Sequence, residues 1–426
     1  MQGDFLSFSK ILKIFIFVFS FINIFFNPLK AADEGLGLEN IFAETLSNHP
    51  NIQGKKNELA AASQNLESSK WQRWPSLSMS TTSGQSSRTN SSTGIISTIR
   101  LDLPLWTAGR VSANIDSASA KTLAAEMTVL EAEQSLLLKA ANAYSDFLRF
   151  SRRLEASEES VREHQRLLEL IQRRSRNEVS SMNEIVLAKA RLDQAKADNL
   201  QIVSQINSAK SQLEQLVGHE IYKINSPRFA LILPDNQNQA IQLALEYAPI
   251  LRRLSAQMKA AESDITVAKS RLYPELSARS DQIIGGVAEG NISYLALTFQ
   301  PGNGLSVLSS TRESEFKKEV AESSIRSAEV DIKTNISADW IQYMSQNSQI
   351  ETLSNLSETT RGVYESFLRQ YAVGRKTWIE VLNARREATQ ARYSLADAEM
   401  QSFYAAIKIQ VACGILNGDA FTISSK

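Results

Sequence analysis

Two long windows of the chain, residues 105–226 and 302–426, carry apolar residues at alternating spacings of four and three. All nine prolines of the sequence lie outside both windows, so neither window contains the residue that most strongly interrupts a helix. A stripe of period 3.5 buries a narrow face and winds helices around each other in a left-handed coil. The stripe consists of Leu123, Met127, Leu130, Gln134, Leu137, Ala141, Tyr144 and Leu148, then Ala195, Asn199, Ile202, Ile206, Ala209, Leu213 and Leu216, in the first window, and of Ile336, Trp340, Tyr343, Asn347 and Ile350, then Val381, Ala384, Ala388, Ala391, Leu395, Ala398, Ser402, Ala405, Ile409 and Ala412, in the second.

The predicted helices are too long for an ordinary globular domain. A helix over 109–176 would extend for roughly 100 Å at 1.5 Å per residue. A narrow apolar stripe opposite wide polar surfaces is typical of a coiled-coil assembly or of the wall of a water-filled tube. Many stripe positions are Ala or Ser, so neighbouring helices can approach closely.

Four short segments, two before each window, change to period two. They are predicted strands near 76–83 and 95–105, and again near 275–284 and 291–300. In each, one face is apolar and the other is mostly polar, as in "PSLSMSTT" and "STIRLDLPL". The connections "GQSSRTNSST" and "IGGVAEGN" are rich in Ser and Gly and suit exposure to water.

The order helix, strand, strand, long helix, long helix occurs twice. "KWQRWPSLS" matches "KSRLYPELS", "LDLPLWTAGR" matches "LALTFQPGNG", and "RNEVSSMNEIVLAKARLDQA" matches "RQYAVGRKTWIEVLNARREA". We therefore predict a first repeat over 32–218, a linker over 219–238, a second repeat over 239–416 and a tail over 417–426.

The number of strands indicates an oligomer. Four strands leave two open sheet edges, whereas membrane β-barrels begin at about eight strands. Three copies would supply a closed barrel of twelve strands, and a strand of about 9 to 10 residues suits a tilted span of a bilayer. The predicted fold is mainly α with four strands, in which long coiled-coil helices would continue as a helical tube below a twelve-stranded membrane β-barrel built from three copies.

The N-terminus has the layout of a secretory signal. Lys10 and Lys13 precede the apolar run "IFIFVFSFINIFF", and small residues follow at Ala31 and Ala32. We predict a signal peptide over 1–31. A signal anchor is the alternative, because "LK" before these alanines is an imperfect cleavage context.

Composition excludes several classes of function. The chain of 426 residues is 43% apolar and 22% charged, too polar for a bundle of lipid-spanning helices. Its formal net charge is zero, which gives no support for a nucleic-acid partner. The adjacent acids Glu158 and Glu159 fit a solvated helix face better than an acid/base pair.

Residues for cofactor or metal chemistry are scarce. Cys413 is the only cysteine and lies in an apolar stretch, so neither an internal disulfide nor a thiolate metal site can form. The histidines His49, His164 and His219 lack ligand spacing and are interpreted as structural or surface residues. We predict no enzyme activity, no cofactor and no metal site.

With these motifs in place, the chain resembles the TolC family of trimeric outer-membrane efflux and type I secretion ducts over roughly residues 35–416. The duplicated order, the "LPLWTAGR" strand end, and "YAVGRKTWIEVLNARREATQARYSLADA" followed by "VACG" carry the resemblance. It implies a β-barrel in outer-membrane lipid, an α-barrel across the periplasm, a homotrimer, a periplasmic adaptor protein, and an inner-membrane pump of the ABC or RND type.

The resemblance also implies site residues at the hairpin turns. Ser180 stands where the family usually has glycine, so the first turn is expected to be less tightly bent. The positions implied to bind the adaptor are Val179, Ser180 and Ser181 in the first repeat and Val373, Gly374 and Arg375 in the second.

A gate at the periplasmic aperture is implied just beyond the second turn. Only Glu380 of its two acidic positions is kept, and Val186 is the expected equivalent in the first repeat. A trimer would then hold a ring of three carboxylates, which attracts cations and is held closed by partners such as Arg375, Lys376 or Arg385. The gate positions are Tyr371, Lys376, Glu380 and Asn383.

The resulting functional hypothesis is an export duct without chemistry of its own. The sequence of the second hairpin resembles the type I, adhesin-exporting branch of the family, and a multidrug or small-molecule duct is the alternative. A periplasmic coiled-coil scaffold or adaptor is the alternative from another class, although it leaves the four amphipathic strands unexplained.

Overall fold

A computed structural model of the chain describes residues 36–83, 95–177, 180–225, 232–285 and 289–416. The predicted signal peptide, tail and first strand-to-strand loop lie outside these residues. The helices are α2 (Leu38–Asn48), α3 (Pro50–Trp71), α4 (Arg110–Arg176), α5 (Met182–Val217), α6 (Gln237–Tyr247), α7 (Pro249–Ser270), α8 (Ser306–Ala372) and α9 (Trp378–Ala412), and the strands are β1 (Ser76–Ser83), β2 (Ile95–Trp106), β3 (Glu275–Ile284) and β4 (Gly290–Thr298).

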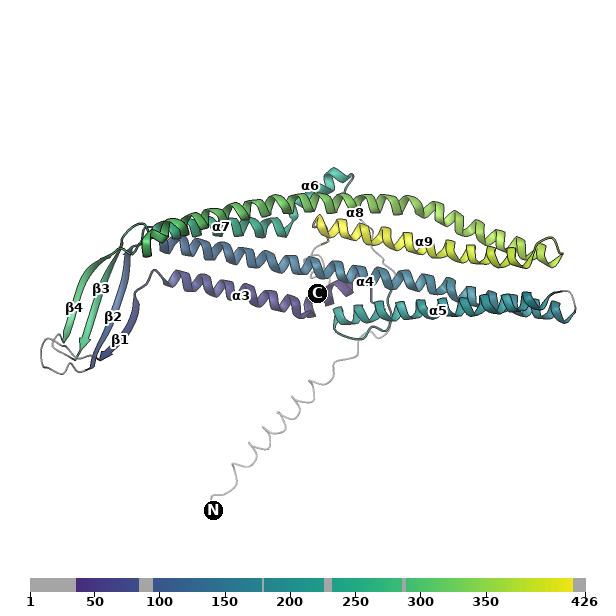
Figure 1. Cartoon of the computed structure of the whole chain (residues 1–426), viewed down its shortest axis with the longest axis horizontal. Coiled ribbons are helices and arrows are strands. Elements are labelled where there is room, and N and C mark those ends of the chain that lie inside the picture. The colour runs from purple at the N-terminus through teal and green to yellow at the C-terminus, as the bar shows by residue number, and fades with distance from the viewer. Residues whose placement is uncertain (1–35, 84–94, 178–179, 226–231, 286–288, 417–426) are drawn as a thin grey trace, which may run out of the picture.

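The molecule is a long rod with a sheet at one end and two helical hairpins at the other (Figure 1). Helices α4 and α8 each have 67 residues, which corresponds to roughly 100 Å. Their shorter companions also match, with 36 residues in α5 and 35 in α9. The predicted helix lengths and the internal duplication are therefore confirmed.

Most of the predicted stripe lies in the helix interfaces. Leu137, Ala141 and Tyr144 are buried in a core where α2, α4, α5 and α9 meet. Leu123 and Asn347 are exposed instead, so the stripe was wrong at these two positions. A helix of 3.6 residues per turn drifts away from a strict 3.5 repeat, and this drift accounts for both.

The four strands form one antiparallel sheet in the order β1-β2-β3-β4. All four predicted strands are confirmed, but β2 continues to Trp106 across an irregularity, and β4 runs from Gly290 to Thr298 rather than to residue 300. Gly302, with a φ of 81°, turns the chain toward α8 soon after β4.

Ion pairs on the polar face of the sheet join the two repeats. Arg100 donates to both carboxylate oxygens of Asp281 at 2.8 and 2.9 Å, and Arg279 donates to Asp102 at 2.7 Å. Each pair stands directly opposite across β2 and β3, the strands at which the repeats meet. The opposite face is exposed and carries Leu77, Met79, Leu101, Leu295 and Leu297.

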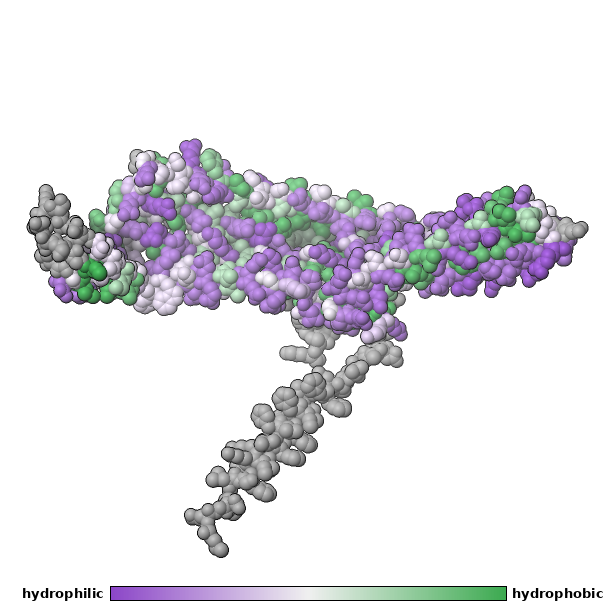
Figure 2. Space-filling view, turned by 60° about the horizontal axis from the view of Figure 1, so that its bottom comes forward, coloured by the Kyte–Doolittle hydropathy of each residue, from purple (hydrophilic) through white to green (hydrophobic). Residues whose placement is uncertain are grey.

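Figure 2 shows a mostly hydrophilic surface with hydrophobic side chains gathered on the sheet and along the hairpin end. Among the described residues, no helix is both long and apolar enough to span a membrane. Cys413 is buried near α6, where its thiol contacts the Ala240 carbonyl at 3.4 Å. Burial raises the pKa of the Cys413 thiol to about 11, so it is unreactive.

Candidate functional site

The turn of the second hairpin is closed by a glycine in the left-handed region. Gly374 has a φ of 74°, its N–H donates to the Tyr371 carbonyl at 3.0 Å, and the Arg375 N–H donates to the Gln370 carbonyl at 2.9 Å. These two bonds form the Schellman arrangement that ends a helix at a residue with positive φ. Val373 and Arg375 are exposed beside it, and their predicted contact with an adaptor stays a prediction.

The first turn of α9 is held by Glu380. Its carboxylate accepts hydrogen bonds from the Thr377 N–H at 2.8 Å and the Thr377 hydroxyl at 2.9 Å, and it pairs with Lys376 at 2.7 Å. The Lys376 hydrogen bond, followed by those from Thr377, lowers the pKa of Glu380 to about 2. Glu380 therefore acts as the acidic partner of a capping box, and its charge is shared with Lys376. Asn383, the other predicted gate position on this helix, lies one turn further and is half-buried.

The first hairpin starts its returning helix in the same way. The Ser181 N–H donates to the Glu184 carboxylate at 3.2 Å, three residues into α5. Matching the two caps makes Glu184 the counterpart of Glu380, which corrects the expectation that placed Val186 there. Val186 is exposed on the next turn. Val179 lies outside the described residues, so the tightness of this turn stays a prediction; Ser180 is half-buried.

An aromatic cluster lies behind the second turn. The rings of Tyr371 and Trp378 are 5.2 Å apart, and the guanidinium of Arg174 lies 4.8 Å above the Tyr371 ring. Both aromatic residues belong to a core shared with α4 and α5. Tyr371 therefore links the turn of one hairpin to the helix of the other.

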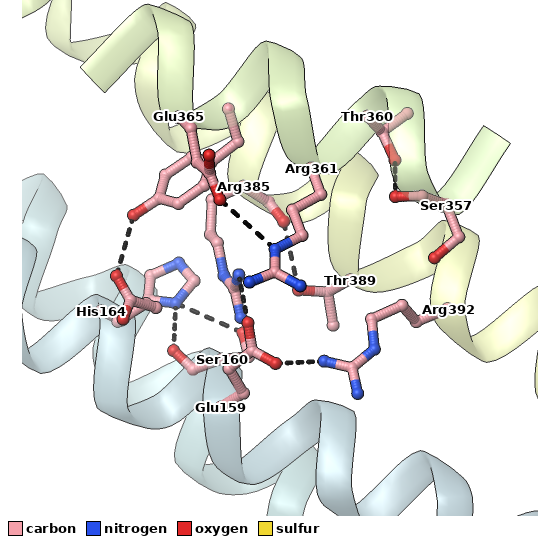
Figure 3. Close-up of polar contacts among 12 residues, drawn as sticks. Glu159, Ser160, His164, Ser357, Thr360, Arg361, Glu365, Arg385, Thr389 and Arg392 are labelled. Carbon is pink, nitrogen blue, oxygen red and sulfur yellow. Dashed lines mark hydrogen bonds and ion pairs between the residues drawn. The ribbon is translucent and has the colours of Figure 1, made fainter. Parts of the chain in front are cut away.

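Further along the helices, a partly buried polar network joins the two hairpins (Figure 3). Glu159 of α4 is paired with Arg385 at 3.4 Å and with Arg392, both on α9. The Tyr364 hydroxyl of α8 donates to Glu163 of α4 at 3.1 Å. Burial alone would raise the pKa of Glu159, but the two arginines outweigh it and hold the pKa below its usual value. Glu159 therefore clamps α9 to α4.

This network was missed in the sequence, where Glu158 and Glu159 were both assigned to a solvated face. The interpretation holds for Glu158, whose side chain is 53% exposed and pairs with Arg162 on its own helix. It is wrong for Glu159, because the side chain of its partner Arg385 is only 5% exposed. Arg385 was expected to hold the aperture carboxylates, and it binds Glu159 instead.

His164 is buried in the same network. Its Nδ1 lies 2.8 Å from the Ser160 carbonyl. Burial lowers the pKa of His164, the Ser160 hydrogen bond opposes this, Arg385 and Arg191 lower it further, and Glu163 raises it. The net direction is downward, so the ring is neutral in the folded protein near pH 7.

We predict that acidification destabilises the hairpin end through His164. Its folded pKa lies below the unfolded value of about 6.5, so the unfolded chain binds the proton more readily and stability falls as pH drops below about 6.5. Melting temperatures measured between about pH 8 and pH 5 should fall less in His164→Asn than in the unaltered protein.

His219 supplies the matched control for this pH experiment. It is exposed, and its pKa is raised by the Glu220 carbonyl and by Glu44. The stability it contributes is present below the unfolded pKa and is lost as pH rises, so His219→Asn should not reduce the acid sensitivity. An unchanged acid response in His164→Asn would contradict the assignment.

No group of His, Cys, Asp and Glu among the described residues has an arrangement that would hold a metal ion. The arrangement instead offers a rigid polar-faced sheet, two long hairpins and a clamped end.

The chain belongs to the outer membrane efflux protein family, whose model matches residues 41–219 and 240–414. It is therefore an outer-membrane protein that reaches into the periplasm, in a family of channels rather than enzymes. The resemblance noted in the sequence is confirmed.

The chain is similar to the outer membrane protein TolC of Vibrio cholerae, with 23% identity over 327 residues that cover 71% of this chain and 73% of the relative. It is 22% identical to the efflux protein BepC of Brucella suis over 354 residues, 75% of this chain and 72% of the relative. Among solved structures, VceC of Vibrio cholerae superposes with a TM-score of 0.78 at 18% identity, covering 88% and 96% of the two chains. The Campylobacter jejuni CmeC channel gives 0.78 at 12% identity over 91% and 88%.

We predict that replacing Glu380 with alanine raises the ion conductance of the reconstituted channel, because it removes both the cap of α9 and the Lys376 link. Glu387→Ala on the same helix is the control, since this carboxylate is exposed and further from the turn. Equal conductance in the Glu380 variant and the unaltered protein would place Glu380 on the outer wall.

Proposed function

We propose that three copies of this chain form one exit duct of a tripartite export system, which receives cargo from an inner-membrane ABC or RND pump through a periplasmic adaptor. The cargo is proposed to be protein of the adhesin type, as in type I secretion. The homotrimer would close a twelve-stranded barrel in outer-membrane lipid and continue as a helical tube.

The open sheet carries the trimer proposal. β1 and β4 are its two edges, and each leaves one side of its backbone unpaired within the described sheet. An exposed apolar face on an open sheet is an aggregation hazard in water, and closure in a membrane removes both problems. A scaffold that stays in the periplasm would leave both unsolved.

The helices support the same assembly. Exposed apolar side chains of α8 fall within roughly 120° of each other at 100° per residue, so they form one stripe along the rod. A second copy is the natural cover for a stripe that follows the full helix. The stripe consists of Leu308, Phe316, Val320, Val330, Ile341, Met344, Leu356 and Val363.

The cargo is proposed from the second hairpin, whose "GRKTWIEVLNARREATQARYSLADA" looks closer to the type I branch. A multidrug or small-molecule duct is the competing proposal, and the efflux name of the Brucella relative favours it. The test is a strain lacking this chain. Retention of a secreted adhesin with unchanged dye efflux supports protein export, whereas dye accumulation with normal adhesin secretion contradicts it.

A further inference from the structure

The hairpin end carries excess positive charge, although the whole chain has a formal net charge of zero. We define the mouth segments as residues 170–177, 180–184 and 368–383. They contain six basic and two acidic residues, and Glu178, which lies outside the described residues, lowers this excess of four charges per chain to three. The basic residues are Arg173, Arg174, Arg176, Arg369, Arg375 and Lys376, and the acidic residues are Glu184 and Glu380.

The two described carboxylates of the mouth segments already have hydrogen-bond or ion-pair partners. Glu184 and Glu380 cap α5 and α9, and Glu380 is also paired with Lys376. Carboxylates placed in this way give the mouth little free negative charge.

Most of the arginines, by contrast, have no carboxylate partner. Arg174 lies over the ring of Tyr371 rather than against an acid. Within the part of the chain that the structure describes, Arg173, Arg176, Arg369 and Arg375 form no ion pair, and all four are exposed. The positive charge of the mouth is therefore directed to solvent.

Helix dipoles do not cancel this charge. Four of the arginines lie in the last turns of α4 and α8, where the negative end of the helix dipole favours positive charge. They are Arg173, Arg174, Arg176 and Arg369. However, α5 and α9 begin at the same end of the molecule, so two negative and two positive helix ends oppose each other. The excess that remains belongs to the side chains.

The sheet at the other end of the rod provides the contrast. Its polar face pairs Arg100 with Asp281 and Arg279 with Asp102, and Arg110 of α4 pairs with Glu275 at 2.5 Å. These charges of the sheet are paired at short range. The exposed arginines of the mouth segments have no such carboxylate opposite them among the described residues.

We propose that the mouth is selective for anions, so that small anions and acidic stretches of a polypeptide enter in preference to cations. The proposal rests on the trimeric duct proposed above, in which three copies would gather nine excess positive charges around one entrance. Charges within a Debye length of about 8 Å act on an entering ion at physiological salt, and rings of Arg or Lys select anions. It reverses the cation preference expected from a Glu380 ring.

The first test is the reversal potential of the reconstituted channel in a potassium chloride gradient. The unaltered protein should prefer chloride. The combined variant Arg173→Gln, Arg176→Gln, Arg369→Gln and Arg375→Gln should lose that preference, whereas Arg→Lys at the same four positions keeps the charge and should retain it. Cation preference in the unaltered protein, or equal reversal potentials in the Gln and Lys variants, would overturn the proposal.

The second test separates this proposal from the duct itself. A fluorescent poly-aspartate peptide should bind the detergent-extracted protein at low salt, release at high salt, and bind the Gln variant several-fold more weakly than the Lys variant. Binding equal in the two variants contradicts an anion-attracting mouth even where no channel forms. Poly-aspartate binding without any conductance would support the anion-attracting mouth and contradict the proposed trimeric duct.

Discussion

Replacing Glu159 with glutamine is expected to loosen the contact between α9 and α4 near the hairpin end. The variant leaves Arg385, with a side chain 5% exposed, without its carboxylate, and it also frees Arg392. Breaking a buried ion pair costs 3–5 kcal/mol; since the Glu159 side chain is 32% exposed, we expect about 2 kcal/mol. The melting temperature should fall, protease cleavage near the turns should become faster, and the reconstituted channel should conduct more.

The adjacent Glu158→Gln variant is the matched control. It removes the same charge one residue away, but Glu158 is exposed and its contact with Arg162 at 3.8 Å lies on the helix surface. Such pairs contribute about 0–1 kcal/mol, so melting and conductance should remain close to those of the unaltered protein. Similar losses in both variants would show that a general charge effect, rather than the clamp, is responsible.

Replacing Gly414 with alanine is expected to separate α6 from the end of α9. An added Cβ would lie 2.4–2.8 Å from three ring atoms of Tyr247, the last residue of α6. Gly414 also has a φ of 73°, which is unfavourable for residues with a side chain. Overpacking of this kind costs about 1–3 kcal/mol in addition to the backbone strain, so we expect a large drop in melting temperature.

Gly374→Ala is the control, because it adds the backbone strain without the steric overlap. Gly374 has nearly the same backbone, with a φ of 74°, but a Cβ there would meet nothing within 4 Å. Only the strain of about 1–2 kcal/mol should remain. If the two variants lose the same stability, the contact between Gly414 and Tyr247 does not hold α6 in place.

The rods and the sheet were predictable because their signals are local and repeated. An apolar stripe continues for many turns of each long helix, all nine prolines lie outside the two long-helix windows, and each strand contains a run of alternating positions. The duplication doubles every signal, so a weak pattern in one repeat is supported by the other. The errors at Leu123 and Asn347 arise where a long stripe drifts out of phase with the helix.

Other features depend on partners far away in the sequence. Glu159 and Glu158 look alike in the sequence, and only the approach of α9 assigns one to a buried clamp and the other to solvent. The role of Glu184 was missed because the two hairpin sequences were aligned without a gap from the turn onward, which pairs Glu380 with Val186. Aligning the N-cap residues Ser181 and Thr377 pairs Glu380 with Glu184. Its signal was present, since Ser181 followed three residues later by Glu184 is the pattern of a capping box.

Assembly of three copies through β1 and β4 is the central claim. The repeats equate β4 with β2 and β1 with β3, and Asp102 stands opposite Arg279 in the observed sheet. "LDLPLWTAGR" matched to "LALTFQPGNG" makes Ala296 the equivalent of Asp102, and "PSLSMSTT" matched to "PELSARSD" makes Ser80 the equivalent of Arg279. Ala296 of one copy should therefore face Ser80 of the next.

The most direct measurement is disulfide crosslinking of the double variant Ser80→Cys and Ala296→Cys in isolated outer membranes. Background is low because the single native cysteine, Cys413, is buried. Mild oxidation should produce covalent species that stop at three copies, and the out-of-register pair Ser80→Cys and Ile292→Cys should crosslink far less. A protein that folds and reaches the membrane, yet stays monomeric on oxidation or forms a ladder beyond three copies, would contradict the closed trimer.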